Sequence, residues 1–163
     1  MIVEFRQADP AKELRSLVAF DHKVFPRSDW FSPSQWRAYE SYWMLVDGRK
    51  AGCCAFERHT DFRDDLHEDG VDPPLRGCLH IVSSGILPRD QGKGFGILMK
   101  AWQVSFARHH GFVRMVTCSR KSNRAMIELN RKFGFRTVRT TRGYYSGPVE
   151  SAVVMEWLKK SRK

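Results

Sequence analysis

The stretch ILPRDQGKGFG, residues 86–96, decides how this chain folds, because it joins strand-forming residues to a helical pattern through three glycines. Glycine is favoured where a turn needs a positive φ or where another group must approach the main chain closely. The residues that follow repeat apolar side chains at helical spacing, at Phe95, Leu98, Met99, Trp102 and Phe106. We therefore predict that the glycines lie at a helix N-terminus, where N–H groups and the helix dipole favour an anion such as phosphate.

Three phosphate-binding motifs can be compared with these glycines. A P-loop needs Ser or Thr after Gly-Lys, but Lys93 is followed by Gly94. A dinucleotide fingerprint G-x-G-x-x-G fails because its third glycine would fall on Ile97. Residues 91–96, QGKGFG, instead resemble the Q/R-x-x-G-x-G/A signature of the GNAT superfamily of acyl-coenzyme A dependent N-acetyltransferases, whose loop wraps the coenzyme's pyrophosphate. The alternative is a plain glycine-rich turn before a helix.

The composition indicates one compact domain over residues 1–163, with 42% hydrophobic residues and five Trp. The apolar runs are too short to span a membrane, and the N-terminal residues MIVEFRQADP lack the pattern of a signal peptide. We therefore expect a cytoplasmic protein with no membrane partner. The four cysteines form no CxxC pair and lie in apolar stretches, so we expect reduced thiols and no zinc site: Cys53, Cys54, Cys78 and Cys118.

The formal charge of +10 and the pI near 9.8 raise nucleic acid as a partner. Residues 59–76, however, carry six of the eighteen acidic residues, so we treat residues 59–77 as an acidic insertion loop. The remaining basicity also suits a ligand with several phosphates, and a solvated basic surface explains most of it. We regard nucleic acid as an unlikely partner, although the basic stretch 135–145, FRTVRTTRGYY, keeps a nucleic-acid binder as an alternative.

The order of the predicted elements is β-α-α-β-β-β-α-β-α-β-β, which indicates a single α/β domain around a mixed sheet. A hairpin turn is expected at Asp47-Gly48 between two strands in residues 41–59. The remaining predicted elements are strands at 2–6, 78–86, 112–118, 135–143 and 151–158, and helices at about 10–21, from 32–34, from the glycine loop, and at 122–133.

The same element order is found in the GNAT superfamily, and a second segment adds to the resemblance. Residues 123–135, NRAMIELNRKFGF, resemble the family segment N-x-x-A-x-x-x-Y-x-x-x-GF. Residues 24–32, VFPRSDWFS, and 143–155, GYYSGPVESAVVM, look like segments of ribosomal-protein alanine and other protein N-terminal acetyltransferases. The resemblance covers essentially the whole chain and implies a mixed, mostly antiparallel central sheet flanked by helices on both faces.

The resemblance implies direct transfer of an acetyl group from acetyl-coenzyme A, used as a co-substrate, to a primary amine. The coenzyme's pantetheine arm would lie beside residues 83–86, where Gly85 allows a bulge, and a nearby N–H would stabilise the oxyanion. A simple strand irregularity at Gly85 and a helix N-cap at Asn123 are the alternatives. The implied coenzyme-binding residues are Ser84, Gly85, Ile86, Gln91, Gly92, Lys93, Gly94, Phe95, Gly96, Ile97 and Asn123.

The candidate catalytic residues depart from the family pattern. Asn130 replaces the usual general-acid tyrosine, and Cys118 occupies the position of the glutamate base. A hydrogen bond from Asn130 to sulfur would suffice, because a thiolate leaves without full protonation. His80 or Glu57 would take the role of base, with a structural histidine and a surface ion pair as the alternatives. Tyr144 and Tyr145 would hold a peptide or supply a phenolic proton, with Tyr145 the catalytic candidate and packing over the sheet edge as the alternative.

The acceptor is expected to be a protein or peptide amine, with a small amine metabolite or antibiotic as the competing substrate. A non-catalytic coenzyme-binding regulator is the further alternative, because the usual Tyr and Glu are missing. His59 and His67 lie among carboxylates in the acidic insertion, but their spacing is irregular and we expect no metal.

Overall fold

The computed structural model describes residues 1–58 and 77–161. The contact pattern divides the chain into a first unit, Met1–Phe56 with Val82–Met99, and a second unit, Glu57–Ile81 with Lys100–Lys163. The prediction of a single domain over residues 1–163 stays a prediction. Most of the acidic insertion, including His59 and His67, lies outside the described residues.

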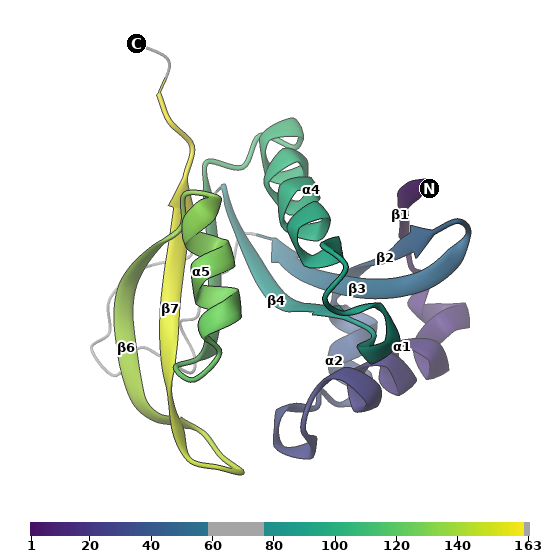
Figure 1. Cartoon of the computed structure of the whole chain (residues 1–163), viewed down its shortest axis with the longest axis horizontal. Coiled ribbons are helices and arrows are strands. Elements are labelled where there is room, and N and C mark those ends of the chain that lie inside the picture. Colours follow the sequence, from purple (N-terminus) through teal and green to yellow (C-terminus); the bar gives the residue numbers. More distant parts are fainter. Residues whose placement is uncertain (59–76, 162–163) are drawn as a thin grey trace. The chain divides into compact units, whose positions relative to one another are not determined.

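Four strands pair side by side in the first unit, and the hairpin predicted at Asp47-Gly48 joins two of them. Both turn residues have positive φ, 50° and 77°, as a two-residue hairpin requires. The two pairs formed by the first three strands are antiparallel. In their order in the sheet, the strands are β1 (Val3–Gln7), β2 (Glu40–Val46), β3 (Arg49–Arg58) and β4 (Cys78–Ile86), the last with the predicted bounds (Figure 1).

Both helices of the N-terminal region begin at a proline behind a capping side chain. Helix α1 (Pro10–Val24) is capped by Asp9, which accepts a hydrogen bond from the N–H of Ala11. Helix α2 (Pro33–Ala38) starts with a capping box between Ser32 and Gln35. Helix α1 extends beyond the predicted end at residue 21, and two short 3-10 helices were not predicted: η1 (Arg27–Asp29) and η2 (Pro88–Asp90).

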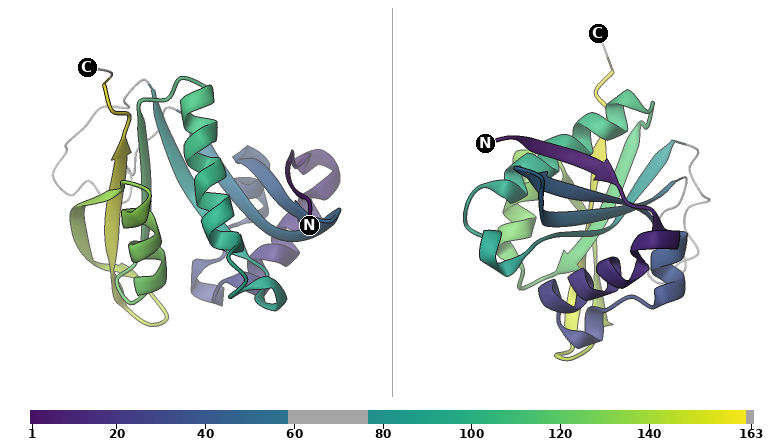
Figure 2. Two further views of the ribbon diagram at one scale, coloured as in Figure 1. Left: turned by 45° about the horizontal axis from the view of Figure 1, so that its top comes forward. Right: turned by 90° about the vertical axis from the view of Figure 1, so that its right-hand side faces the viewer.

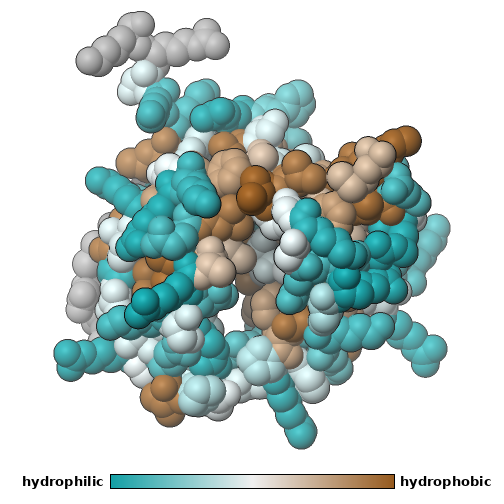
Figure 3. All heavy atoms as spheres, viewed as in Figure 1, coloured by the Kyte–Doolittle hydropathy of each residue, from teal (hydrophilic) through white to brown (hydrophobic). Residues whose placement is uncertain are grey.

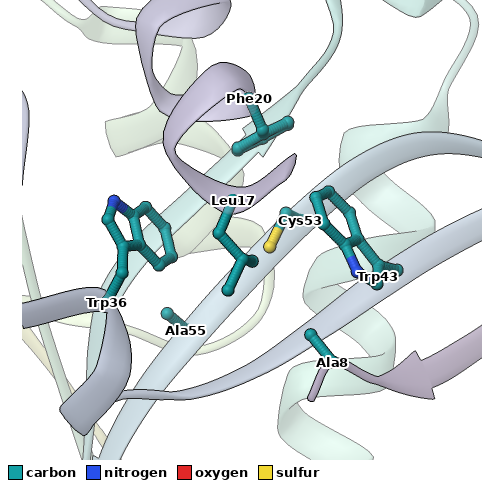
Figure 4. Packing of buried hydrophobic residues seen from close by; sticks show 7 residues of the cluster. All are labelled: Ala8, Leu17, Phe20, Trp36, Trp43, Cys53 and Ala55. Carbon is teal, nitrogen blue, oxygen red and sulfur yellow. The ribbon is translucent and has the colours of Figure 1, made fainter. Parts of the chain in front are cut away.

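The core of the first unit lies between these helices and the strands. Leu17 and Phe20 of α1 meet Trp36 of α2, Trp43 of β2 and Cys53 of β3, and Figure 4 shows these side chains pointing toward one another. The right-hand view of Figure 2 shows α1 and α2 on the same side of β2 and β3. Burial of such large apolar side chains is the main stabilising contribution, about 1.5–3 kcal/mol for each.

The first turn of a third helix, α4 (Phe95–His109), packs on the opposite face of the same strands. A Cβ added to Gly52 would lie 2.9 Å from Met99 Cε, whereas the neighbouring Cys53 belongs to the cluster under α1. Successive residues of a strand point to opposite faces, so helices cover both faces of the sheet in this unit. The predicted mixed, mostly antiparallel sheet with helices on both faces is confirmed.

The second unit contains the other half of the sheet. Strand β4 pairs in parallel with β5 over Cys78–His80, and the remaining pairs are antiparallel. Among the described residues the sheet has seven strands, and β6 lies at its edge. From β4 outward, the strands are β5 (Arg114–Arg120), which starts and ends two residues later than predicted, β7 (Glu150–Leu158) and β6 (Arg136–Tyr145).

Helix α5 (Arg124–Lys132) covers one face of this half, and Figure 1 and the left-hand view of Figure 2 both show it beside β7. Its Asn130 side chain contacts Met155 of β7, with Nδ2 and Sδ 3.7 Å apart. The C-terminal part of α4 lies on this face too, because Arg108 lies over the ring of Trp157 with Cζ 5.5 Å from its centroid. Residues of β7 at odd positions therefore face the helices.

The surface mixes hydrophilic and hydrophobic residues. On the face shown in Figure 3, brown residues are exposed in several areas with teal and white residues between them. In the part of the chain that the structure describes, no helix is both long and apolar enough to cross a membrane. Within the same residues, no group of three His, Cys, Asp or Glu side chains is placed to hold a metal ion.

Candidate functional site

The glycine loop, residues 91–96, leads directly into α4, as the sequence predicts. Gly92 and Gly94 have φ of 73° and 83°, in the left-handed region where other residues are strained. A Cβ built at either glycine would meet no atom of the described residues within 4 Å. The glycines are therefore required by the backbone rather than by crowding, and the space beside them is open to a ligand.

The first turn of α4 presents main-chain donors next to this open space. The first N–H groups of an α-helix have no acceptor within the helix, and the positive end of the helix dipole lies there. Phe95 anchors the turn in the core, whereas Ile97 and Leu98 are 51% and 40% exposed. Leu98, although part of the apolar repeat, therefore lies outside the core.

Side chains of the loop and of β4 hold this turn in place. Gln91 Nε2 donates to the carbonyl oxygen of Ile86 at 3.0 Å, which closes the loop against the end of the strand. Ser84 Oγ contacts Met99 Sδ at 3.3 Å. Ser83 Oγ is buried and has no hydrogen-bond partner among the residues that the structure describes. Lys93 Nζ lies 3.4 Å from a carboxylate oxygen of Asp90.

The structure gives a reason for glycine at position 85 that the sequence did not indicate, namely close packing against α1. A Cβ at this position would lie 2.8 Å from Val24 Cγ1 and 3.1 Å from Phe25 Cζ, so α1 approaches the strand too closely for a side chain. Ser84 and Gly85 point to opposite faces, as strand alternation requires. The bulge and the contact with an acyl group at Gly85 stay predictions.

In the second unit, one face of the sheet carries two of the candidate catalytic residues. His80 is buried on β4 and pairs with Val116 of β5, so its side chain shares a face with Val116 and Cys118. Tyr145 lies on that same face, because its hydroxyl is 3.4 Å from Cys118 Sγ. Tyr145 packs against the buried cluster of Cys78, Val116, Ala152 and Val154 on this face.

Arg120 fixes the tyrosine hairpin, the β6–β7 connection that follows Tyr145. Its guanidinium donates to the carbonyl oxygens of Pro148 and Ser146 at 2.8 and 2.7 Å. The same group lies over the ring of Tyr145, with Cζ 4.6 Å from the centroid, a cation–π contact. The guanidinium is also 3.4 Å from Glu150 Oε1. The Ser122 hydrogen bonds are the larger cause that lowers the pKa of the Glu150 carboxyl group, and Arg120 lowers it further.

Asn130 lies on the other face of the same sheet. Its partner Met155 pairs with Thr117, whereas the adjacent Val154 pairs with Cys118, and adjacent strand residues point to opposite faces. Asn130 is only 1% exposed, and its Oδ1 atom has no hydrogen-bond partner within the described ranges. The structure therefore brings His80 and Tyr145 to one face and places Asn130 on the helix side.

Two further residues that the sequence predicted for the site are Asn123 and Glu57. Asn123 caps α5, since its Oδ1 accepts from the N–H of Met126 at 3.2 Å. This is the alternative that the sequence left open, and a contact with coenzyme stays a prediction. Glu57 is half-buried at the second-last position of β3, where it neighbours Arg58.

Sequence reasoning missed Arg120 and the ion pairs of Asp90. Arg120 could have been found from strand alternation, which puts it on the same face as Cys118 two residues earlier. The ion pair of Asp90 could not be predicted from the sequence, because its partner Arg49 lies 41 residues away in the chain.

Comparison with known proteins adds to this geometry. The family model described as the acetyltransferase (GNAT) family matches residues 11–135. Among curated proteins, no sequence matches this chain. The matched residues include the glycine loop and the predicted second family segment up to Phe135.

Three solved structures share the fold. The ribosomal-protein-S18-alanine N-acetyltransferase from Escherichia coli is 14% identical, with a TM-score of 0.78 over 99% of this chain and 97% of that chain. The yncA protein from Salmonella typhimurium with its cofactor acetyl-CoA is 19% identical, with a TM-score of 0.74 over 100% and 97%. An IAA acetyltransferase from Bacillus cereus is 15% identical, with a TM-score of 0.71 over 97% and 100%.

Proposed function

Because the chain belongs to the acetyltransferase (GNAT) family, we propose that it transfers an acetyl group from acetyl-coenzyme A to the amino terminus of a protein or peptide. The glycine loop is the observation that carries this proposal. It combines open space beside two glycines of positive φ with the N-terminal amides of α4. Such an arrangement suits a pyrophosphate, which needs several main-chain donors in one concave turn.

The residues of the first unit fit the coenzyme. Amides of residues 92–97 would donate to the pyrophosphate, and Lys93 would add a positive charge. The coenzyme, when bound, supplies an acetyl thioester whose sulfur leaves as a thiolate. Main-chain groups of Ser84, Gly85 and Ile86 would hold the arm that carries it.

The proton transfers would fall to His80 and Tyr145. The His80 imidazole would accept a proton from the attacking amine. The Tyr145 hydroxyl, on the same face, would donate a proton to the departing sulfur, whereas Asn130, buried against Met155 on the opposite face, would not reach it. An α-amine has a pKa of about 8, so much of it is neutral at pH 7 to 8 and a weak base suffices.

A peptide acceptor is favoured by the two segments that resemble protein N-terminal acetyltransferases. The segment at residues 24–32 is well ordered, because Asp21 accepts from the N–H of Phe31 at 2.8 Å and from Trp36 Nε1 at 3.2 Å. Trp30 stacks on His22 with centroids 3.6 Å apart, and its Nε1 donates to the carbonyl oxygen of Phe25. The aromatic side chains of this segment would offer apolar contacts to an extended peptide.

A small amine is the second candidate acceptor, because the shared fold alone does not separate peptide from small-molecule acceptors. A nucleic-acid binder is less favoured. Arg136, the first arginine of the basic stretch 135–145, forms hydrogen bonds to Glu156 at 3.1 and 2.7 Å.

Thiol release from acetyl-coenzyme A, measured with a panel of acceptors, tests the proposal. The panel contains peptides with different N-terminal residues, the same peptides with blocked N-termini, polyamines and aminoglycosides. We expect turnover on free but not on blocked peptide N-termini. Turnover only on the small amines would overturn the peptide acceptor, and coenzyme binding without thiol release on any amine would support the non-catalytic regulator.

A further inference from the structure

The turn that precedes the glycine loop contains a buried carboxylate. Asp90 ends η2 and is only 1% exposed, although it borders the exposed loop. A buried carboxylate without partners is strongly destabilising, so the contacts of Asp90 decide whether this turn keeps its shape. Its main-chain N–H donates to the carbonyl oxygen of Leu87 at 2.8 Å, which completes the 3-10 turn.

Arg49 binds this carboxylate in a two-point contact. Nη1 and Nη2 donate to Oδ2 and Oδ1 at 2.7 and 2.8 Å, the geometry of a strong, directional ion pair. These hydrogen bonds are the largest cause that lowers the pKa of Asp90, so the carboxylate stays charged at neutral pH. Arg89 and Lys93 approach the same carboxylate less closely, each at 3.4 Å.

Arg49 is itself held in place as the first residue of β3, after the Asp47-Gly48 turn. The tip of this hairpin is tied to the N-terminus, because Ile2 and Asp47 exchange two hydrogen bonds of 2.8 Å. The main chain after β4 is tied to the same strand, since the N–H of Leu87 donates to the carbonyl oxygen of Ala51 at 2.8 Å. A further hydrogen bond runs from Arg89 Nη2 to the carbonyl oxygen of Lys50 at 3.2 Å, so the glycine loop starts from a turn that is held to this hairpin by main-chain contacts and by the Arg49–Asp90 ion pair.

We infer that Arg49 is a positioning residue, which acts through Asp90 to hold the glycine loop in the conformation that binds the coenzyme's pyrophosphate. The inference rests on the proposed function. A loop with glycines at positions 92 and 94 has many accessible conformations, and ordering it only on binding would weaken affinity. The ion pair orders the start of this loop before the ligand arrives.

The competing explanation is that Arg49 only attracts the anion by its charge. The two explanations predict opposite results for Asp90→Asn, because this change makes the loop one unit more positive, whereas Arg49→Met makes it one unit less positive. Positioning predicts that both variants bind acetyl-coenzyme A more weakly. Attraction by charge predicts weaker binding for Arg49→Met and tighter binding for Asp90→Asn.

Titration calorimetry with acetyl-coenzyme A on the full chain provides the test. We expect the Kd to rise about tenfold in Arg49→Met and in Asp90→Asn, and about tenfold rather than a hundredfold in the double variant, because the pair acts as one unit. Arg49→Lys keeps the charge but loses the two-point contact, so an intermediate Kd is expected. In turnover assays, the KM for acetyl-coenzyme A should rise while kcat at saturation is kept.

Arg6→Met is the matched control, because Arg6 makes a similar two-point contact with Glu13, at 2.9 and 3.2 Å, in the same unit. It should leave the Kd unchanged. If the unmodified chain binds acetyl-coenzyme A but both loop variants bind as tightly as Arg6→Met, or if Asp90→Asn binds tighter, the inference is overturned. Should Arg49→Met not fold, Arg49→Lys and Asp90→Asn decide. Absence of binding by the unmodified chain would instead contradict the proposed function.

Discussion

The glycine loop of the first unit and the tyrosine hairpin of the second unit are built in different ways. In the loop, the groups that meet a ligand are main-chain amides, and the two glycines need their positive φ while their side-chain space is open. In the hairpin, Tyr145 is held by side chains, with Cys118 at its hydroxyl and Arg120 over its ring. A loop of this kind depends on backbone geometry, whereas the hairpin depends on individual functional groups.

The largest effect on coenzyme binding is expected from a substitution in the glycine loop. Gly94→Val forces a β-branched residue into a left-handed conformation, at a cost of roughly 1–2 kcal/mol, and fills the open space. We expect the Kd for acetyl-coenzyme A to rise at least about 100-fold in calorimetry, while the circular dichroism spectrum keeps its shape.

Gly111→Val is the control for this change. Gly111 follows α4, has φ of 76° and also has open space among the described residues, so it brings the same strain at the other end of the helix. It should lower the Tm by a similar amount and leave the Kd unchanged. Equal loss of binding in both variants would mean that strain, and not the loop, causes the effect.

A substitution in the tyrosine hairpin should change turnover rather than coenzyme binding. Tyr145→Phe removes only the hydroxyl beside Cys118, and we expect kcat to fall roughly 100-fold if this group supplies the proton. The KM for acetyl-coenzyme A should stay the same. Tyr144→Phe, which keeps the edge-to-face contact between the two rings, is the matched control, and a full kcat in Tyr145→Phe would remove the proposed role.

A smaller effect is expected at His80. His80→Gln should lower kcat/KM for a peptide acceptor by about tenfold at pH 7, less than the 100-fold typical of a general base because the α-amine is partly neutral. The loss should shrink above pH 8, where the amine no longer needs a base. A loss that is the same at every pH would identify His80 as a structural residue of β4.

The smallest effect concerns an ion pair of the first unit outside the loop. The Arg6 hydrogen bonds are the largest cause that lowers the pKa of Glu13 to about 2, against a smaller opposing effect of burial. A lowered carboxyl pKa stabilises the fold above the unfolded-state pKa and loses this effect as the pH falls toward about 2. Glu13→Gln should therefore reduce the free energy of unfolding by about 1 kcal/mol at pH 7, after allowance for the half-exposed Arg6, and hardly at all near pH 2.

Urea unfolding at several pH values measures this difference, and acetyl-coenzyme A affinity should be unaffected. A stability difference between Glu13→Gln and the unmodified chain that persists unchanged at pH 2 would contradict the assignment to this ion pair. Together with the loop variants, Glu13→Gln distinguishes an ion pair that only stabilises the first unit from the Arg49–Asp90 pair, which is proposed to position the glycine loop.

The sequence predicted those parts of the structure that depend on residues close together in the chain. The bounds of β4, the Asp47-Gly48 hairpin and the glycines before α4 follow from strand pattern, turn chemistry and helix entry within a few residues. The contacts of Tyr145 could not be predicted, because Cys118 lies 27 residues away and meets it only through the pairing of β5, β7 and β6. The pattern of a helix likewise gave no sign that Asn130 faces the side of the sheet opposite Tyr145.

The central claim is that main-chain amides of residues 92–97 bind the coenzyme's pyrophosphate. Titration of the isotope-labelled full chain with acetyl-coenzyme A, followed by the chemical shift of each backbone N–H, measures this directly. The account predicts that the amides of residues 92–97 show the largest shifts and that all follow one binding curve. If these amides stay unchanged while the coenzyme binds and shifts others, the claim is contradicted.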